Sequence, residues 1–221
     1  MRVGGSRRKL ERAALGVRVE PRIERDTVDG RGAESRAFAS EVLEGWSGPV
    51  VVDADALWVL ANGLARLRST AERGGRAGAG QGADVVVTPH AGEAERLTGE
   101  SREAIAADRI AFARRSAIAM AGTFLLKGNP TIVADKSGVV TLNTTGNCGM
   151  ATAGAGDVLT GLIAGLLAQG MGGAEAARAG AWLHGRAGDL AAGARGFRSL
   201  IAGDILECVP QAIREVDERA G

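Results

Sequence analysis

Residues 146–170, "GNCGMATAGAGDVLTGLIAGLLAQG", join a glycine-rich beginning to an apolar second half. Apolar side chains recur in the second half with the spacing of one helix face. They are Leu159, Leu162, Ile163, Leu166 and Leu167. Gly161 and Gly165 would let a neighbouring backbone approach this helix closely. The run from Val158 to Ala168 falls well short of the roughly 20 apolar residues that cross a bilayer, so it predicts a buried core helix.

The start of the same helix has a different character. Gly154 and Gly156 leave backbone N–H groups accessible at the positive end of the helix dipole, which is a suitable place for a phosphate group. Asp157 follows directly, and a carboxylate beside phosphate is repelled unless it accepts a proton from an attacking hydroxyl or meets a metal ion. The alternative is that Asp157 only stabilises the first turn of the helix.

Composition limits the classes of protein to consider. The chain has 221 residues and a formal net charge of +1, so it suits one domain and lacks the basic surface that binding of nucleic acid requires. Its two cysteines, Cys148 and Cys208, have neither disulfide-framework nor zinc-site spacing, which fits the reducing cytoplasm. The arginine-rich start has no apolar signal region. Neither a nucleic-acid partner nor a membrane partner is expected.

Strand and helix patterns alternate after residue 33. Strands are predicted at 49–55, 85–89, 123–127, 131–135 and 139–143, with a hairpin turn at 135–138. Helices are predicted at 34–46, from 56 onward, at 101–122 with Ser101 as N-cap, and in three segments after residue 154, where Pro210 marks a break or a new start. A glycine-rich connection is predicted at 69–84. The strands are fully apolar, which predicts an α/β fold with a mostly parallel sheet and helices on both faces.

Polar residues follow the predicted strands at the edge where ligands bind in such folds. Asp53 and Asp55 would point the same way and lie near magnesium, or else cap the next helix. His90 and Glu93 follow the second strand, as ligand contacts or as residues satisfied by the backbone of a helix start. Lys127 ends the third strand, before a turn that either meets phosphates or is an ordinary hairpin. His184 is predicted to be a packed structural histidine.

Four segments taken together resemble one family. They are "VVVDADAL", "VVVTPHAGEAERLTG", "LLKGNPTIVAD" and "NTTGNCGMATAGAGDVLTGLIAGLLAQG". This series resembles the ADP- or ATP-dependent NAD(P)H-hydrate dehydratases, a branch of the ribokinase-like superfamily with a three-layer α/β fold. The resemblance runs from about Gly30 to Val209 and implies a nucleotide-dependent repair reaction that restores NADH or NADPH from its 6-hydroxy hydrate.

The resemblance also implies roles for particular residues. Asp157 would be the catalytic base and contact the hydrate together with His90. The adenine nucleotide would be held by Lys127, Gly128, Asn129, Pro130, Thr131 and Gly156. The phosphate loop would comprise Asn147, Gly149, Met150, Ala151, Thr152 and Gly154. Mg²⁺ would accompany ADP or ATP, although no residue is identified as its ligand, and an NAD(P)H-hydrate epimerase would be a functional partner in the cytoplasm.

The first part of the chain departs from this pattern. Residues 1–33 are arginine-rich and match the family poorly, so we expect a disordered or frame-altered segment and a nucleotide-binding catalytic domain over 34–221. N-terminal strands would then be missing, and open sheet edges would favour a homo-oligomer. Two alternatives stay open: a ribokinase-like kinase of a small alcohol such as a hydroxymethylpyrimidine, and a catalytically impaired nucleotide-binding remnant.

Overall fold

The computed structural model describes residues 33–60, 62–74 and 84–220. Its five strands form one sheet in the order β1-β2-β3-β4-β5. Their bounds are Val50–Val52, Val85–Val87, Thr123–Leu126, Thr131–Ala134 and Val140–Asn143. The first three strands are parallel, and β3, β4 and β5 are antiparallel neighbours. The carboxyl ends of β1, β2 and β3 therefore meet at one edge of the sheet.

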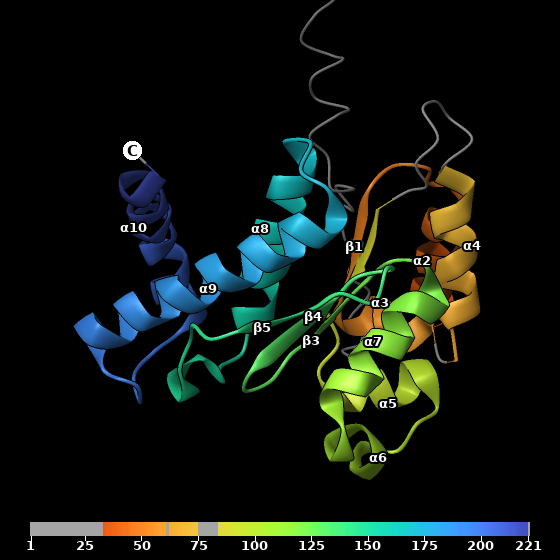
Figure 1. The fold of residues 1–221 in the computed structure, drawn as a ribbon, viewed down its shortest axis with the longest axis horizontal. Coiled ribbons are helices and arrows are strands. Elements are labelled where there is room, and N and C mark those ends of the chain that lie inside the picture. The colour runs from red at the N-terminus through yellow and green to blue at the C-terminus, as the bar shows by residue number, and fades with distance from the viewer. Residues whose placement is uncertain (1–32, 61, 75–83, 221) are drawn as a thin grey trace, which may run out of the picture.

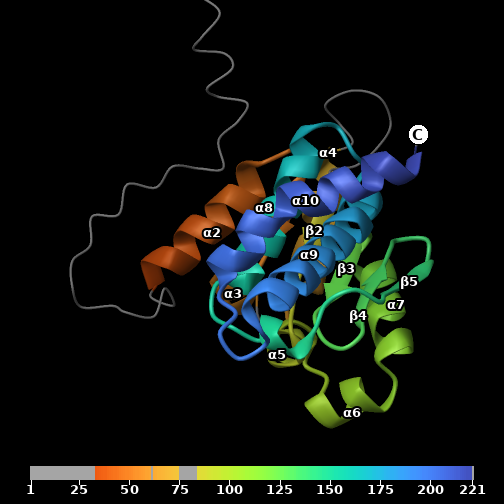
Figure 2. The same cartoon turned by 90° about the vertical axis from the view of Figure 1, so that its left-hand side faces the viewer.

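Helices cover both faces of this sheet, which confirms the predicted α/β fold (Figures 1 and 2). On one face lie α2 (Ala33–Gly45), α3 (Ala54–Val59), α4 (Leu64–Gly74), α5 (Ala91–Thr98), α6 (Arg102–Ala107) and α7 (Arg109–Met120). On the other lie α8 (Ala155–Ala168), α9 (Gly173–Arg195) and α10 (Ala202–Ala220). A short 3₁₀ turn, η1 (Cys148–Met150), precedes α8.

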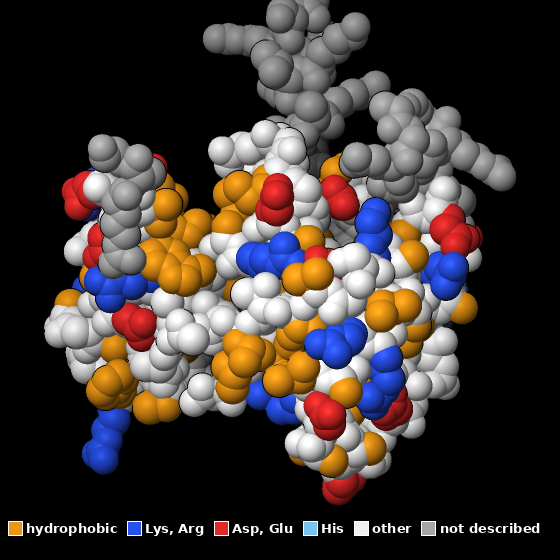
Figure 3. Space-filling model, in the orientation of Figure 1, with side chains coloured by type: hydrophobic (Ala, Val, Ile, Leu, Met, Phe, Trp, Pro, Cys, Tyr) orange, Lys and Arg blue, Asp and Glu red, His pale blue; other side chains and the backbone are white. Residues whose placement is uncertain are grey.

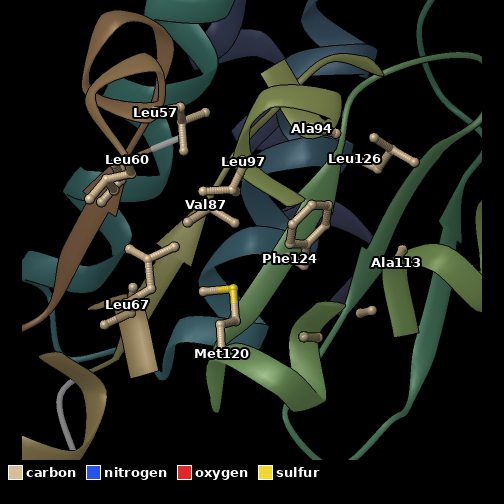
Figure 4. Close-up of a cluster of buried hydrophobic side chains, with 14 of the residues drawn as sticks. Leu57, Leu60, Leu67, Val87, Ala94, Leu97, Ala113, Met120, Phe124 and Leu126 are labelled. Atoms are coloured by element: carbon tan, nitrogen blue, oxygen red, sulfur yellow. The ribbon is translucent and has the colours of Figure 1, made fainter. Parts of the chain in front are cut away.

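Side chains of successive strand residues point to opposite faces, and this alternation divides the core. Phe124 and Leu126 belong to the cluster under α3, α4, α5 and α7, whereas Leu125 between them belongs to the cluster under α8 and α9. Figure 4 shows the first cluster, in which Phe124 lies among Leu97, Met120 and Leu126. All four residues of β3 are buried, so the centre of the sheet is covered on both sides as its apolar strands predicted.

The helix predicted after residue 154 is present as α8, but its close-packing glycines are not the expected ones. Leu159, Ile163 and Leu167 are buried against the sheet and α9. Gly161 and Gly165 have open space where a side chain would lie, so the prediction of a close backbone approach there was wrong. The close approach is made by Gly180 of α9, where a Cβ would lie 2.6 Å from Ile163 Cγ1.

Three helix boundaries also differ from the prediction. The single helix predicted over 101–122 is divided at Asp108, whose side chain accepts a hydrogen bond from the Ala111 amide and so begins α7. Ser101 does cap the first part, as predicted. Pro210 lies inside the continuous helix α10 rather than at a break. Part of the predicted connection 69–84 is helical, because α4 continues to Gly74.

Some predictions concern parts of the chain that the structure does not describe. The expectations for residues 1–32 and for most of the glycine-rich connection, 75–83, lie outside the described residues. Within the described ranges, no helix combines the length and apolar character that crossing a membrane requires.

The contrast between Gly180 and Gly165 gives a test of the packing. Gly180→Ala should lower the free energy of unfolding by roughly 1–3 kcal/mol, because the new methyl group overlaps Ile163. Gly165→Ala, at an open position of α8, should instead raise it by about 0.5–1 kcal/mol through helix propensity. Urea unfolding of both variants measures the two changes, and equal effects would contradict the assigned interface between α8 and α9.

Candidate functional site

The carboxyl ends of the three parallel strands bring together residues far apart in the sequence. Asp53 follows β1, His90 follows β2 after Thr88 and Pro89, and Lys127 follows β3. The backbone joins these ends as well, since the Lys127 amide donates to the Pro89 carbonyl at 2.8 Å. This is the edge at which the sequence predicts a ligand site.

Lys127 lies at the centre of a partly buried charged cluster. Its Nζ lies 2.8 Å from Asp53 Oδ1 and 3.5 Å from Glu93 Oε2. The Thr160 hydroxyl, on α8, donates to Asp53 Oδ2 at 2.8 Å. Burial acts to raise the pKa of Asp53, but the hydrogen bond and charge of Lys127 and the Thr160 hydroxyl outweigh it, so that the pKa is lowered. Two carboxylates thus face one ammonium.

Asp53 occupies the N-cap position of α3 without capping it. Its side chain makes no cap hydrogen bond and turns instead to Lys127 and Thr160. Because α3 begins at Ala54, Asp55 lies exposed in the first helical turn rather than beside Asp53. The expectation that the two aspartates point the same way from an extended strand was therefore wrong.

The N-terminus of α8 lies against this cluster. A Cβ placed on Gly156 would lie 3.6 Å from both Asp53 Oδ2 and Lys127 Nζ. Gly154 takes the N-cap position with a φ of 84°, a conformation that favours glycine. The amides of Gly156 and Asp157, in the first helical turn, have no carbonyl of their own helix to donate to. They are suited to bind an anion.

Asp157 is exposed in the first turn of α8, next to Gly156. The N-cap residue of this helix is Gly154, with no side-chain cap hydrogen bond. At this position the negative charge of Asp157 interacts favourably with the positive end of the helix dipole, and its carboxylate is accessible to a bound molecule. Both interpretations of this residue therefore remain compatible with its surroundings.

His90 and Glu93 form a reciprocal cap at the start of α5. His90 Nδ1 accepts hydrogen bonds from the amides of Gly92 and Glu93, and Glu93 Oε2 accepts one from the His90 amide at 2.8 Å. The structural role considered for both residues is thus present. The other ring nitrogen, Nε2, lies 3.4 Å from Glu93 Oε1 on an exposed imidazole, so His90 can still contact a ligand.

The turn after Lys127 is shaped by an arginine that the sequence did not reveal. Arg109, the first residue of α7, donates from Nη1 to the Asn129 carbonyl at 3.2 Å and from Nη2 to the Lys127 carbonyl at 3.5 Å. The Thr131 hydroxyl donates to the Gly128 carbonyl, and the Asn129–Pro130 bond is cis. No local pattern marks Arg109, because its partners lie 18 and 20 residues away.

The predicted phosphate loop rests on α9. Asn147 donates from Nδ2 to Asp189 Oδ1 at 2.9 Å and accepts from the Gly149 amide at 3.0 Å. Met150 packs among the residues between α8, α9 and α10, where Gly188 provides space for its side chain. The Thr152 carbonyl then accepts a hydrogen bond from the Ala155 amide at 3.3 Å. The loop therefore fixes where α8 begins.

His184 lies behind this helix start. Its Nε2 atom is buried and has no hydrogen-bond partner among the described residues, in keeping with the predicted packed histidine. Burial lowers the pKa of His184 from 6.5 to about 4; a hydrogen bond to the Ala155 backbone acts in the opposite direction, and the charge of Lys127 lowers it again. The imidazole is thus neutral at neutral pH and adds no charge to the site.

Sequence reasoning identified Lys127, Glu93, His90 and Gly156, which lie together, but it missed Thr160. A signal for Thr160 was present, because a single hydroxyl interrupts the apolar run of α8. Among the described residues, no three His, Cys, Asp or Glu side chains are arranged to hold a metal ion. Charges of both signs are interspersed over the face in Figure 3.

Known proteins are similar to this chain in sequence. The sequence profile of a family described as NAD(P)H-hydrate dehydratase matches residues 29–211. A bifunctional NAD(P)H-hydrate repair enzyme of Moorella thermoacetica is 45% identical over 181 residues, which are 82% of this chain and 32% of that protein. An ADP-dependent (S)-NAD(P)H-hydrate dehydratase of Neisseria meningitidis is 42% identical over 177 residues, 80% of this chain and 56% of that protein. The chain thus spans about a third to about half of these relatives.

Solved structures show the same fold. The ADP/ATP-dependent NAD(P)H-hydrate dehydratase of Bacillus subtilis, co-crystallised with ATP/Mg²⁺, superimposes with a TM-score of 0.69 and 28% identity over 84% of this chain and 61% of that one. A ribokinase-like superfamily protein of Enterococcus faecalis has a TM-score of 0.63 and 27% identity over 83% of this chain and 59% of its own.

The neutral state of His184 predicts a pH dependence of stability. Because the folded state holds its pKa below the unfolded value, the unfolded chain binds the extra proton as the pH falls from 6.5 to about 4, and stability is lost over that window. The loss should amount to roughly 3 kcal/mol.

His184→Gln cannot titrate and should lose less stability over the same window. Urea unfolding of both proteins across this range measures the difference, in which carboxylates common to both proteins cancel. Parallel pH profiles would contradict the assignment.

Proposed function

Because the chain belongs to the NAD(P)H-hydrate dehydratase family, we propose that it uses ADP or ATP to dehydrate the 6-hydroxy hydrate of NADH or NADPH and so restores the reduced cofactor. The observation that carries this proposal is the meeting of Lys127 with Gly156, which lies beside Asp157 in the first turn of α8, at the carboxyl edge of the sheet. The family relationship favours this reaction over phosphorylation of a small alcohol.

The proposed reaction follows from the chemistry of the substrate. Hydroxide is a poor leaving group, whereas phosphate leaves readily. Asp157 would accept the proton of the substrate hydroxyl while its oxygen attacks the terminal phosphorus of the nucleotide. Departure of phosphate with the electrons of the C–O bond, and loss of a proton from the adjacent ring carbon, would then restore the ring double bond.

The remaining residues would position the two substrates. The amides of Gly156 and Asp157 would stabilise charge on the transferred phosphate. The turn 127–131 and Gly156 would hold the nucleotide, and His90 would contact the hydrate through its exposed ring edge. The loop that contains Asn147, Gly149, Met150, Ala151, Thr152 and Gly154 would support the phosphate cradle by fixing the start of α8.

Mg²⁺ is proposed to accompany the nucleotide. Asp53 and Glu93 give the cluster one more negative charge than Lys127 balances, so a polyphosphate would be repelled without an added cation. Both carboxylates supply the hard oxygen atoms that Mg²⁺ prefers. The ion would neutralise phosphate charge. The Bacillus subtilis enzyme was co-crystallised with ATP/Mg²⁺.

Several broader properties are proposed with this activity. We propose a cytoplasmic enzyme whose catalytic domain covers 34–221 and which works with an NAD(P)H-hydrate epimerase. We also propose that it forms a homo-oligomer, which the exposed apolar side chains on α10, such as Leu206 and Ile213, support. Sedimentation velocity at micromolar concentration should give a mass above one chain; a monomer would refute the oligomer alone.

Incubation of the purified chain with NADH hydrate, Mg²⁺ and either ADP or ATP tests the activity. The absorbance of the reduced nicotinamide ring should return, and AMP or ADP and phosphate should be released in equal amounts. A chain that binds nucleotide but restores no absorbance would be the impaired remnant rather than an active enzyme.

Asp157→Asn separates the two roles considered for this residue. The amide keeps the size of the side chain but cannot accept the proton, so turnover should fall at least about 100-fold while ADP affinity and melting temperature change little. Retention of full turnover would reduce Asp157 to a stabiliser of the helix start.

A further inference from the structure

Arg109 and the turn 127–131 are shaped around each other. The guanidinium lies against Gly128, where a Cβ would come within 2.3 Å of Nη2, so a residue with a side chain does not fit there without displacing the arginine. Gly128 has a φ of 153°. The hydrogen bonds to the Lys127 and Asn129 carbonyls hold the guanidinium on the backbone of this turn.

The positive charge of Arg109 is not balanced by a carboxylate. Among the residues that the structure describes, no ion pair involves Arg109. Asp108, the adjacent carboxylate, is bonded to the Ala111 amide. Burial lowers the pKa of Arg109, and no neighbouring charge acts against it. The two carbonyls accept from two of the five guanidinium N–H groups, which leaves donors for another acceptor.

Lys127, the more obvious cation of the same turn, is in a different situation. It faces two carboxylates, Asp53 and Glu93, and the three groups together carry a net negative charge. Attraction of a polyphosphate to the turn therefore gains from positive charge other than that of Lys127, in addition to the Mg²⁺ proposed above. Arg109 is a cation on the backbone of this turn whose charge is free to serve that purpose.

We propose that Arg109 supplies the positive charge with which the turn 127–131 holds the phosphates of the nucleotide, an inference that rests on the proposed nucleotide dependence. Arg109 orders the Lys127 and Asn129 carbonyls and presents a guanidinium whose remaining N–H groups favour an anion. Lys127 then serves chiefly to neutralise Asp53 and Glu93.

Direct binding measurements with ADP and with adenosine test this inference without reference to turnover. Arg109→Gln should weaken ADP binding in the presence of Mg²⁺ by at least about tenfold, as expected for loss of a charged hydrogen bond, but should change adenosine binding little. ADP binding by the wild-type protein should also weaken more steeply with added KCl than that of the variant.

Arg114→Gln is a matched control on the same helix. Arg114 also donates to a backbone carbonyl, that of Gly138, but in the hairpin turn between β4 and β5. This variant should bind ADP like the wild type. Arg109→Lys keeps the charge without the forked geometry, and its ratio of ADP to adenosine affinity should lie between those of the wild type and Arg109→Gln.

The outcomes separate a role of charge from a merely structural role. Equal weakening of ADP and adenosine by Arg109→Gln would overturn the proposal, because loss of loop shape affects both ligands. Wild-type ADP affinity in a folded Arg109→Gln would overturn it as well. If Arg109→Gln does not fold, the ratio of ADP to adenosine affinity of Arg109→Lys decides. Weaker ADP binding by Arg109→Lys with unchanged adenosine affinity supports the proposal.

The binding measurements on Arg109 do not depend on the proposed dehydratase activity. A wild-type chain that binds ADP but restores no NADH would refute the dehydratase reaction while leaving the Arg109 measurements valid. A wild-type chain with no affinity for either ADP or ATP would overturn both proposals.

Discussion

The ammonium of Lys127, between the carboxylates of Asp53 and Glu93, joins the ends of β1 and β3 to the start of α5. Thr160 adds α8 to the same network through Asp53. Asp53 is only 9% exposed, and a carboxylate with so little access to water is stable as an anion only while its partners are present. The layers of the fold and the site therefore depend on the same few contacts.

The groups of the site therefore differ in what they do with charge. Some compensate negative charge that is already present, and others are available to interact with added negative charge. Lys127 compensates the buried carboxylates, and the α8 amides offer partial positive charge without any titratable group. His184 remains neutral behind them. Under the proposed function, such an arrangement would keep this edge of the sheet ordered before a ligand arrives, so that little reorganisation would be needed when phosphate charge enters it.

The sequence predicted the regular elements well where one local pattern decided them. Apolar runs located all five strands, and the glycine-rich start of α8 located the edge of the site. Prediction was wrong where distant partners decided the outcome. Asp53 lies where a capping aspartate would lie, yet Lys127 and Thr160, 74 and 107 residues away, take its carboxylate. Arg109 was missed for the same reason.

The errors in helix boundaries have two different causes. The residues on both sides of Asp108 are compatible with a helix, and their apolar pattern predicts one continuous helix. The pattern therefore gave no sign that Asp108 caps a new helix. Pro210 lies inside α10 although proline usually ends a helix, so packing of Val209 and Ala212 against the neighbouring helices outweighs its local preference. A local hydrogen bond decides the first case, and packing between helices decides the second.

The glycines of α9 have a consequence for how sequence variation in this chain should be interpreted. Gly180 accommodates Ile163, Gly185 lies against Thr145, and Gly188 lies against Met150. One helix thus sets the position of both the core of α8 and the loop before it. In a deep mutational scan, these positions would tolerate substitution as poorly as residues that touch substrate, although none of them has a side chain to offer it. Poor tolerance of substitution at these glycines of α9 would therefore reflect close packing against neighbouring segments rather than a role in catalysis.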